Sequence, residues 1–452
     1  MDIDEIKLLN DEYKFFSINC DVSKYNSDSK TNKLDTKSSN NKLSEFTISL
    51  KDAIWLKDVE TTASSNILKG FNPIENSFVV EKILDNGGRI IGKTTQDEFG
   101  FGTFCMNVGS NYEIPLNPVD KERVSGGSSG GAAVAAKLID NHISIAESTG
   151  GSITTPASFC GVVGVCPSYG RVSRNGLITY SSSLDKIGVM SKEIKDSALA
   201  LEIISGKDPK DETSSNLSVG NYVNAVENYK KITNSIKIGI LDFDGVDSII
   251  SNRINELSEL LKNKSIGVDK IDLPFTKKYS LSSYYIIAMS EASTHLASLS
   301  GLRYGVGDDV SKNYNDYFSD VRTKHFSQES KRRILLGTYV RMAGYRGKYY
   351  TKALKVRRKI INEYKSIFAK YDVILCASSP VFAPKFSEAK SMSISDIYNL
   401  DLITSGPNLA GLPNMSVPIN KTEELPFGAL IIANHYEEEK LFAVGSLLGD
   451  FL

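Results

Sequence analysis

The sequence predicts an α/β protein with a large mixed, mostly parallel twisted sheet and helices on both of its faces. Apolar segments typical of strands alternate with amphipathic segments typical of helices, and 452 residues can bury a sizeable core. We expect residues 46–452 to form one domain. Residues 1–45 should be a short N-terminal segment, and its polar stretch at 21–45 has the Ser, Asn, Lys and Asp content of a flexible loop.

The individual elements follow from their hydrophobic patterns. Apolar or alternating runs predict strands, which we place at residues 46–50, 89–94, 142–149, 235–244 and 371–379. Helical periodicity or an alanine-rich run without breakers predicts helices, which we place at residues 76–88, 131–139, 218–235, 282–301, 329–344 and 349–371. Both glycine-rich loops of the chain therefore lie where one element meets the next.

The composition is typical of a globular protein whose positive and negative charges nearly balance. Lys and Arg total 53 against 54 Asp and Glu, so the chain has no excess charge with which to hold a polyanion, and tRNA would need a partner protein. The five cysteines have neither zinc-site nor disulfide spacing, which fits a reducing compartment. No apolar run approaches the roughly 18 residues of a membrane span, and the acidic N-terminus does not resemble a leader, so we expect a cytoplasmic location without membrane contact.

The first glycine loop is "SGGSSGGAAVAA", at residues 125–136. Glycine lets a backbone approach other groups closely, so this loop can bring a hydroxyl against a second polar group. A phosphate-binding loop is one alternative, but such loops end in G-K-[ST], whereas Gly131 is followed by alanines. A plain glycine turn before a helix is the other alternative.

The second glycine loop presents a serine. Thr149, Gly150 and Gly151 precede Ser152, and successive N–H groups in such a turn can converge on an anion. A nucleophile carried by this turn would find donors ready for the oxyanion that its attack creates, each stabilising it by roughly 3 kcal/mol. The pattern indicates a catalytic loop.

A serine nucleophile needs a base, and lysine is the better candidate here. None of the four histidines accompanies a G-x-S-x-G motif, which argues against an α/β-hydrolase triad. Lys51 follows an apolar strand, where burial beside hydroxyl groups would favour the neutral form that a base requires. The alternative is an ordinary lysine at the surface end of a strand.

Three long runs together resemble the amidase signature family. They are "GGSSGGAAVAAKL", "ESTGGSITTPASFCGVVGVCPSYGRVSRNGL" and "SSSLDKIGVMSK", and the likeness extends from about Lys51 to the C-terminus. The resemblance implies a Ser-cisSer-Lys triad on a large mixed sheet, with Ser152 as nucleophile, Ser128 as a bridging serine in a cis peptide bond and Lys51 as base. It also implies an oxyanion hole from Thr149, Gly150, Gly151 and Ser152, without a metal or cofactor in this chain.

Four further segments are similar to the branch that serves tRNA-dependent amidation. They are "SEASTHLASLSGLRYG", "ESKRRILLGTYVRMAGYRGKYYTKALKVRR", "DLITSGPNLAGLPNMSVP" and "PFGALIIANHYEEEKLF". This similarity implies glutamine hydrolysis, with B and C subunits as partners, charged tRNA bound mainly by the B subunit, and ATP and Mg²⁺ in the partner. Substrate binding would fall to Arg333, Asp401 and Ser129, because a guanidinium can hold an α-carboxylate and a carboxylate can pair with an α-ammonium.

Three positions depart from the family pattern. Ala53 stands where the family usually has asparagine, Ser148 where it has aspartate, and Thr154 where it has arginine. If the aspartate and arginine normally pair, losing both together leaves no unpaired buried charge. The departures keep two alternatives open: a stand-alone amidase acting on small amides, and a catalytically inactive scaffold subunit.

Overall fold

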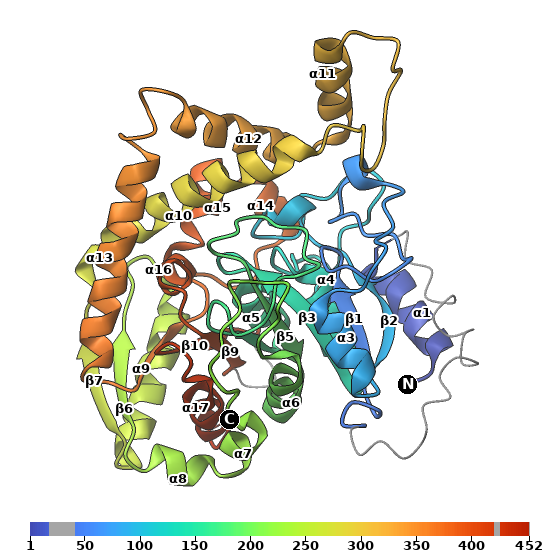
Figure 1. The fold of residues 1–452 in the computed structure, drawn as a ribbon. Coiled ribbons are helices and arrows are strands. Elements are labelled where there is room, and N and C mark those ends of the chain that lie inside the picture. The colour runs from blue at the N-terminus through green and yellow to red at the C-terminus, as the bar shows by residue number, and fades with distance from the viewer. Residues whose placement is uncertain (18–40, 420–424, 452) are drawn as a thin grey trace.

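A computed structural model describes residues 1–17, 41–419 and 425–451, which fold around one central sheet (Figure 1). The polar stretch expected at 21–45 lies outside these residues except for its last five, which form a turn before the first strand. Within the described part of the chain the sheet has ten strands, in the order β2-β1-β3-β5-β4-β9-β10-β8-β6-β7. The strands are β1 Thr47–Lys51, β2 Arg89–Thr94, β3 His142–Ser148, β4 Val163–Cys166, β5 Lys186–Ser191, β6 Lys237–Leu241, β7 Gly267–Ile271, β8 Val373–Ala377, β9 Asn414–Pro418 and β10 Gly428–Ala433.

The sheet is mixed, as the sequence predicts, but its parallel share is smaller than expected. β1 pairs in parallel with β2 and β3 at one end, and β6 pairs in parallel with β7 and β8 at the other. The five pairings between β3 and β8 in the strand order are antiparallel. β4 and β5, like β9 and β10, follow each other without an intervening helix among the described residues, and strands joined in this way pair antiparallel.

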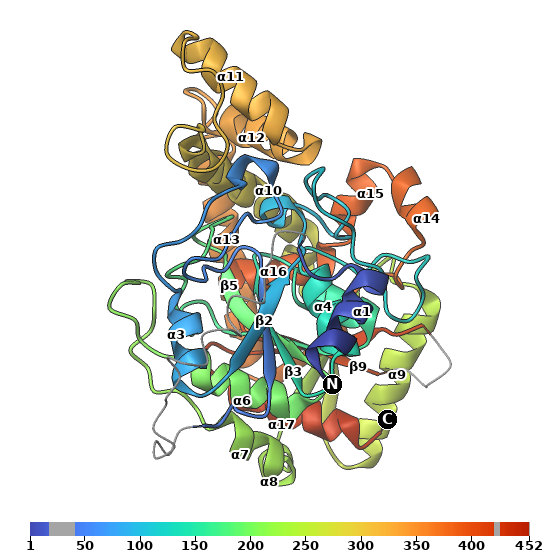
Figure 2. The ribbon, with the colours of Figure 1, turned by 90° about the vertical axis from the view of Figure 1, so that its right-hand side faces the viewer.

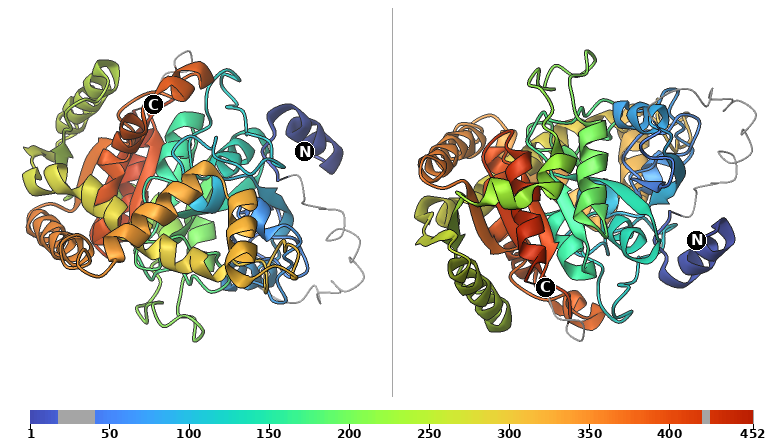
Figure 3. Two further views of the ribbon diagram at one scale, coloured as in Figure 1. Left: turned by 90° about the horizontal axis from the view of Figure 1, so that it is seen from above. Right: turned by 90° about the horizontal axis from the view of Figure 1, so that it is seen from below.

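Helices flank both faces of the sheet (Figures 2 and 3), which confirms the predicted fold class. Alternate side chains of one strand join two different core clusters, as the two-residue period of a strand requires. Ile143 and Ile145 of β3 belong to the larger cluster, which includes Leu201 and Leu448, whereas Ala146 belongs to the cluster that includes Ala133.

The helices of the first half of the chain are α1 Ile3–Tyr13, α3 Phe78–Asp85, α4 Gly130–Leu138, α5 Thr154–Cys160, α6 Ile194–Ile204, α7 Tyr222–Glu227, α8 Tyr229–Thr233 and α9 Ser248–Asn263. The later helices are α10 Pro274–His295, α11 Tyr314–His325, α12 Gln328–Arg341, α13 Tyr350–Phe368, α14 Phe386–Ser391, α15 Ile394–Asn399, α16 Leu402–Ala410 and α17 Glu438–Gly449. Among the described residues, none of these helices combines the length and apolar character that crossing a membrane requires.

Most predicted elements occur close to their expected places, with two differences. The helix expected at 218–235 is two short helices, α7 and α8, which meet at Asn228. The Asn228 side chain bonds to Asn224, and such local side-chain bonds compete with helix continuation. The helix expected at 282–301 begins earlier, at Pro274, because proline is well suited to the first turn of a helix.

The N-terminal helix α1 packs on the edge of the sheet. Asp2 and Glu5 form a capping box at its start, and Ile6 and Phe15 join the cluster that covers α4. The backbone N–H of Ser17 donates to the carbonyl oxygen of Lys93, in β2. The described part of the N-terminal segment is therefore held by the same core as the sheet.

Helices α10, α12, α13 and α16 pack together, with α10 and α12 across the top of the view in Figure 1 and α13 down its left side. α10 contacts the other three, and it packs closely against α12 at Gly337. A Cβ atom at Gly337 would lie 1.9 Å from the carbonyl oxygen of Met289. This close contact fixes the position of α12, which carries Arg333.

Replacing Gly337 with alanine should force α10 and α12 apart. We expect Gly337→Ala to lower the free energy of unfolding by about 1–3 kcal/mol, the usual range for overpacking. Chemical denaturation measures this difference, and Gly347→Ala is the matched control because a Cβ at Gly347 meets no atom within 4 Å. Equal stability of the two variants would contradict the assigned packing.

Candidate functional site

The candidate site lies where β1 and β3 end side by side. The two strands are parallel, with Leu50 opposite Ile145, so their carboxyl ends lie at the same edge of the sheet. Lys51 is the last residue of β1 and Ser148 the last of β3. The loop 149–152 follows β3 directly and leads into α5, which brings it next to Lys51.

Lys51 is completely buried and makes three polar contacts. Its Nζ atom lies 2.7 Å from the Oγ atom of Ser128, 2.9 Å from the carbonyl oxygen of Glu147 and 2.9 Å from Oε2 of the same residue. The last contact is a buried ion pair. Burying a charge is costly unless it is paired and hydrogen-bonded, and these contacts satisfy that requirement.

The first glycine loop holds Ser128 in place. The peptide bond between Gly127 and Ser128 is cis, and the carbonyl oxygen of Ser128 accepts a hydrogen bond from the N–H of Asp97. Ser129 connects this loop to β3 and to the second glycine loop: its hydroxyl donates to the carbonyl oxygen of Glu147 and its N–H to that of Ser152. The substrate contact expected of Ser129 stays a prediction, because its hydroxyl already has a protein partner.

The second glycine loop leaves its donors available. Within the described residues, the N–H groups of Gly150, Gly151 and Ser152 donate to no protein acceptor. Ser152 keeps 7% of its surface exposed, whereas Lys51 and Ser128 have none. A reacting group could therefore reach Ser152 while the groups behind it stay shielded from water.

Close packing against α10 and α16 explains the two glycines of this loop. A Cβ at Gly150 would lie 2.7 Å from the hydroxyl oxygen of Tyr284, and one at Gly151 would lie 2.8 Å from Oγ1 of Thr404. Asn408 donates from Nδ2 to the carbonyl oxygen of Gly150 at 2.6 Å. The loop thus has room only for glycine on the side that faces these helices.

Two buried carboxyl groups flank Thr149. Its hydroxyl oxygen lies 2.9 Å from Oε1 of Glu147 and 2.8 Å from Oδ1 of Asp185. Asp185 also accepts hydrogen bonds from the N–H groups of Tyr180 and Ser181. Burial raises the pKa of Asp185 well above its usual range, and the charge of Glu147 adds to this effect.

Arg333, which belongs to α12, is surrounded by aromatic side chains. Its Nε atom donates to Oε1 of Glu329 at 2.7 Å, and Nη1 donates to the hydroxyl of Tyr180 at 2.5 Å. The centres of four aromatic rings lie 5.1 to 5.7 Å from its guanidinium carbon. They belong to Phe101, Tyr180, Tyr285 and Tyr398.

Asp401 precedes α16 and shares an aromatic neighbour with Arg333. The Tyr285 hydroxyl donates to Oδ2 of Asp401 at 2.5 Å, and the same ring packs against the Arg333 guanidinium. Burial raises the pKa of Asp401 to about 6, against the opposing effects of the Tyr285 hydroxyl and Arg333. Thr404 and Asn408, three and seven residues further along, lie on the same side of the helix and face the second glycine loop.

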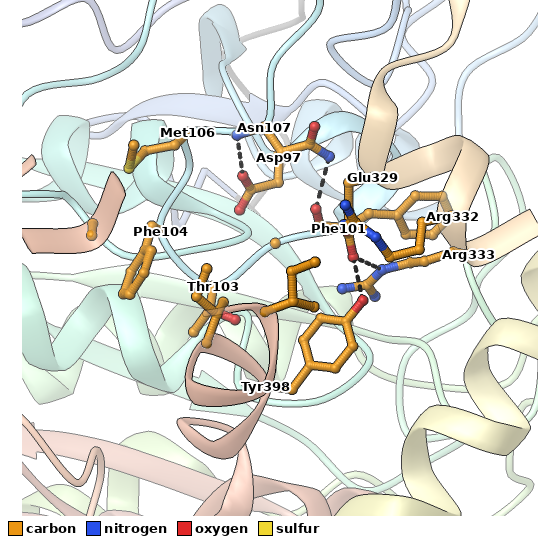
Figure 4. Close-up of a pocket in the computed structure, with 14 residues that line it drawn as sticks. Asp97, Phe101, Thr103, Phe104, Met106, Asn107, Glu329, Arg332, Arg333 and Tyr398 are labelled. Atoms are coloured by element: carbon orange, nitrogen blue, oxygen red, sulfur yellow. Dashed lines mark hydrogen bonds and ion pairs between the residues drawn. The ribbon is translucent and has the colours of Figure 1, made fainter. Parts of the chain in front are cut away.

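A cavity of about 160 Å³ opens onto Arg333 (Figure 4). Glu329 accepts from Tyr398 at 2.7 Å on one side of it, and Asp97 accepts from the N–H of Asn107 at 2.8 Å on the other. Burial raises the pKa of Asp97 to about 6, although its bonds from backbone N–H groups act in the opposite direction. The cavity offers a route from solvent to the caged guanidinium.

The residues that the sequence singled out fall into two groups, one around Lys51 and one in which Arg333 and Asp401 share Tyr285. Lys51 and Ser128 are in contact, and Ser129 connects them to the loop of Ser152. The roles expected of these residues stay predictions. Sequence reasoning missed Glu147, Asp185, Tyr180, Tyr284 and Tyr285, although the position of Glu147 directly before the second loop was a signal that could have drawn attention to it.

The three unusual positions have different surroundings. The Ser148 hydroxyl donates to the carbonyl oxygen of Gly150 at 2.7 Å and so supports the loop. The hydroxyl of Thr154 is buried, and among the described residues it has no hydrogen-bond partner. Ala53 is buried and accepts from the N–H of Ile178. Support for the loop therefore comes from hydroxyl and backbone groups rather than from an ion pair at these positions.

His142 lies on β3, the strand that leads into the second glycine loop. Both ring nitrogens of His142 are bonded, to Thr47 and Ser49, and burial lowers the pKa of this imidazole to about 3. These bonds assign it a structural role within the sheet. No group of three or more His, Cys, Asp or Glu side chains among the described residues is arranged to hold a metal ion.

Comparison with known proteins agrees with this geometry. The family model described as "Amidase" matches residues 3–442. The A subunit of glutamyl-tRNA(Gln) amidotransferase from Trichodesmium erythraeum is 41% identical over 88% of this chain and 82% of its own length. The crystal structure of the corresponding Thermotoga maritima protein superposes with a TM-score of 0.74 at 34% identity, over 88% of this chain and 81% of that one. A crystal structure of an amidase, 22% identical, shares the fold with a TM-score of 0.79 over 100% of this chain and 95% of that one.

The raised pKa of Asp401 predicts a pH-dependent stability. The Asp401 carboxyl group has a pKa of about 6 in the folded protein, against 3.8 ordinarily. Its contribution to the free energy of unfolding is therefore complete below about pH 4, where the group is protonated in both states, and is lost as the pH rises through 6. Asp401→Asn removes this loss, so its stability relative to the wild type should increase by about 3 kcal/mol between about pH 4 and pH 8. Denaturation at several pH values measures the trend. The exposed Asp244→Asn serves as control, and a stability difference for Asp401→Asn that does not vary with pH would contradict the assignment.

Proposed function

Because the chain belongs to the amidase family, we propose that it is the glutamine-hydrolysing component of a tRNA-dependent amidotransferase. The observation that carries the proposal is the 2.7 Å contact between Lys51 and Ser128, buried beside the loop of Ser152. A lysine and a serine in contact next to the loop of a second serine are the groups that an amidase of the Ser-Ser-Lys type needs. The 41% identity to a glutamyl-tRNA(Gln) amidotransferase chain favours glutamine as the amide.

In the proposed mechanism Ser152 attacks the side-chain amide carbon of glutamine. Its proton passes to Ser128, whose own proton passes to Lys51 in the neutral form. The N–H groups of Thr149, Gly150, Gly151 and Ser152 stabilise the oxyanion, which forms where they converge.

Breakdown of the tetrahedral intermediate returns a proton to the leaving group. Lys51 passes it through Ser128 to the amide nitrogen, the carbon–nitrogen bond breaks and ammonia leaves. Water then attacks the acyl-enzyme, with the same lysine and serine as base, and releases glutamate. The ammonia is the product that a partner protein would use.

Arg333 and Asp401 are proposed to select an amino-acid amide over a simple amide. The guanidinium keeps Nη2 without a protein acceptor among the described residues, so it can receive the α-carboxylate of the substrate. Oδ1 of Asp401 has no bonded donor in the same residues and can receive the α-ammonium. Tyr285 holds the two charged groups near each other.

The proposed partners are the B and C subunits of the amidotransferase. In this assignment the B subunit binds the charged tRNA and uses ATP and Mg²⁺ to activate it, so this chain needs neither cofactor. The nearly neutral net charge, −1, is consistent with a chain that does not itself hold the tRNA. Glutamyl-tRNA(Gln) and aspartyl-tRNA(Asn) are both possible acceptors.

Ammonia release from glutamine tests the proposed activity. We expect the chain, assembled with its partner proteins, to release ammonia from glutamine but not from asparagine or a simple aliphatic amide. Ser152→Ala should reduce this release by at least about 10⁴-fold, because it removes the nucleophile. Ser144→Ala is the matched control, because it deletes another buried hydroxyl, whose bonding partner in the described part of the chain is Ser49.

The alternatives predict other outcomes in the same assay. Equal release from simple amides would favour a stand-alone amidase. No release from an assembled, folded complex would favour an inactive scaffold subunit, in which case Ser152→Ala would leave glutamine-dependent tRNA amidation unchanged.

Arg333→Lys tests the proposed selection of glutamine. A lysine keeps the charge but loses the planar fork, and a charge-assisted hydrogen bond contributes about 1.5–3 kcal/mol. We therefore expect KM for glutamine to rise about 10- to 100-fold. Steady-state kinetics measure it, with Arg341→Lys on the same helix as control. An unchanged KM would exclude Arg333 from carboxylate binding.

A further inference from the structure

Glu147 has no role in the mechanism above, yet it contacts the base directly. Lys51 Nζ has three acceptors within 2.9 Å, which is the number of hydrogens on an ammonium group. Two of these acceptors are oxygen atoms of Glu147. The described arrangement thus fits a charged Lys51, whereas attack by Ser152 requires a neutral one.

The Thr149 hydroxyl gives the second observation. It lies between Oε1 of Glu147 and Oδ1 of Asp185, at 2.9 and 2.8 Å. A hydroxyl has one hydrogen, so it can donate to only one of these two carboxyl groups. The other contact is a hydrogen bond only if that carboxyl group itself carries a proton. Burial raises the pKa of Asp185, which favours Asp185 as the protonated member.

A continuous chain of hydrogen bonds therefore runs from Asp185 through Thr149, Glu147 and Lys51 to Ser128. We propose that Glu147 is a positioning residue that orients Lys51 and stores the proton that Lys51 must release before it can act as base, with Asp185 supporting it through Thr149. The inference rests on the proposed amide hydrolysis by Ser152, and it adds a proton acceptor behind the triad.

The proton balance closes within the pair. One proton moves from Nζ of Lys51 to Oε2 of Glu147, which leaves a neutral amine and a neutral carboxylic acid. The amine then takes the Ser152 proton through Ser128 and later returns it to the leaving nitrogen. When the carboxylic acid gives its proton back to Lys51, the ion pair is restored without any exchange with solvent.

Other titratable groups surround this chain and belong to its electrostatics. Those that interact with its members are Asp97, Cys105, Cys166, Tyr169 and Arg174. Arg174 is the cation among them, and its charge lowers the pKa of Asp185. Lys51 is therefore the cation that compensates Glu147 directly.

The pH profile of Glu147→Gln tests the proton store. With Glu147 present, Lys51 becomes neutral without losing a proton to water, so activity extends to low pH. In the variant each attack requires release of that proton to solvent, and we expect the acidic limb of the profile to move to higher pH by about one unit or more, with kcat lowered about 10²-fold and KM unchanged. A limb that stays in place or moves to lower pH would overturn the proposal.

A second readout does not depend on glutamine. An alkyl fluorophosphonate forms a bond from phosphorus to an activated serine oxygen as fluoride leaves, and its labelling rate should show the same shift of the acidic limb. Ser152→Ala should remain unlabelled. Labelling without glutamine hydrolysis would refute the proposed substrate while still testing Glu147, so the two failures can be told apart.

Glu438→Gln is the matched control for loss of a buried carboxylate. Glu438 is fully buried and lies 3.5 Å from Arg171 in an ion pair remote from Lys51. We expect this variant to lose stability without any shift of the labelling profile. An equal shift in both variants would assign the effect to general loosening of the core and overturn the proposal.

Infrared spectroscopy tests the shared proton without any reaction. At neutral pH the difference spectrum between the full-length wild type and Asp185→Asn should contain the C=O stretch of a protonated carboxyl group, and the difference spectrum between the wild type and Glu438→Gln should not contain this band. A double variant tests the connection through Thr149. Thr149→Val should shift the acidic limb of the labelling profile. Adding Asp185→Asn to Thr149→Val should cause no further shift, because Thr149 connects Asp185 to Glu147. Absence of the band, or additive shifts, would refute the role of Asp185.

Discussion

The burial of Lys51 is the constraint on which the rest of the site depends. A lysine with no exposed surface is tolerated only where its charge is paired or its proton is removed, and both conditions need other polar groups at fixed positions. β1 and β3 supply the frame, because their parallel pairing brings Glu147 beside Lys51. The first glycine loop then brings Ser128 to the remaining side of the amine.

The second glycine loop is packed closely on the side that faces α10 and α16. α10 and α16 approach the loop until Tyr284 and Thr404 leave no space for a side chain at Gly150 or Gly151. Asp401 precedes α16 and is bonded to the aromatic neighbour of Arg333. One helix thus connects the loop of the proposed nucleophile to the groups proposed to recognise the substrate, so recognition and chemistry share a rigid support.

The sequence was informative where local pattern controls the structure. The strands near 47–51, 89–94 and 142–148 follow their apolar runs, and helices α3 and α4 between them were placed within a few residues. The antiparallel centre of the sheet was not predicted, because whether two strands pair depends on the path of the loop between them. Asn228 divided a predicted helix for a related reason, since a side-chain bond outweighed a regular hydrophobic period.

The sequence by itself determined the α/β class, the two glycine loops and the candidate residues Lys51, Ser128 and Ser152, because each depends on residue type and order along the chain. Only the tertiary structure showed that Glu147 pairs with Lys51, and that Thr149 links it to Asp185. The physical reason is distance along the chain. Lys51 and Glu147 are separated by 96 residues, and no local pattern specifies which buried carboxylate a lysine will meet once strands from different parts of the sequence align.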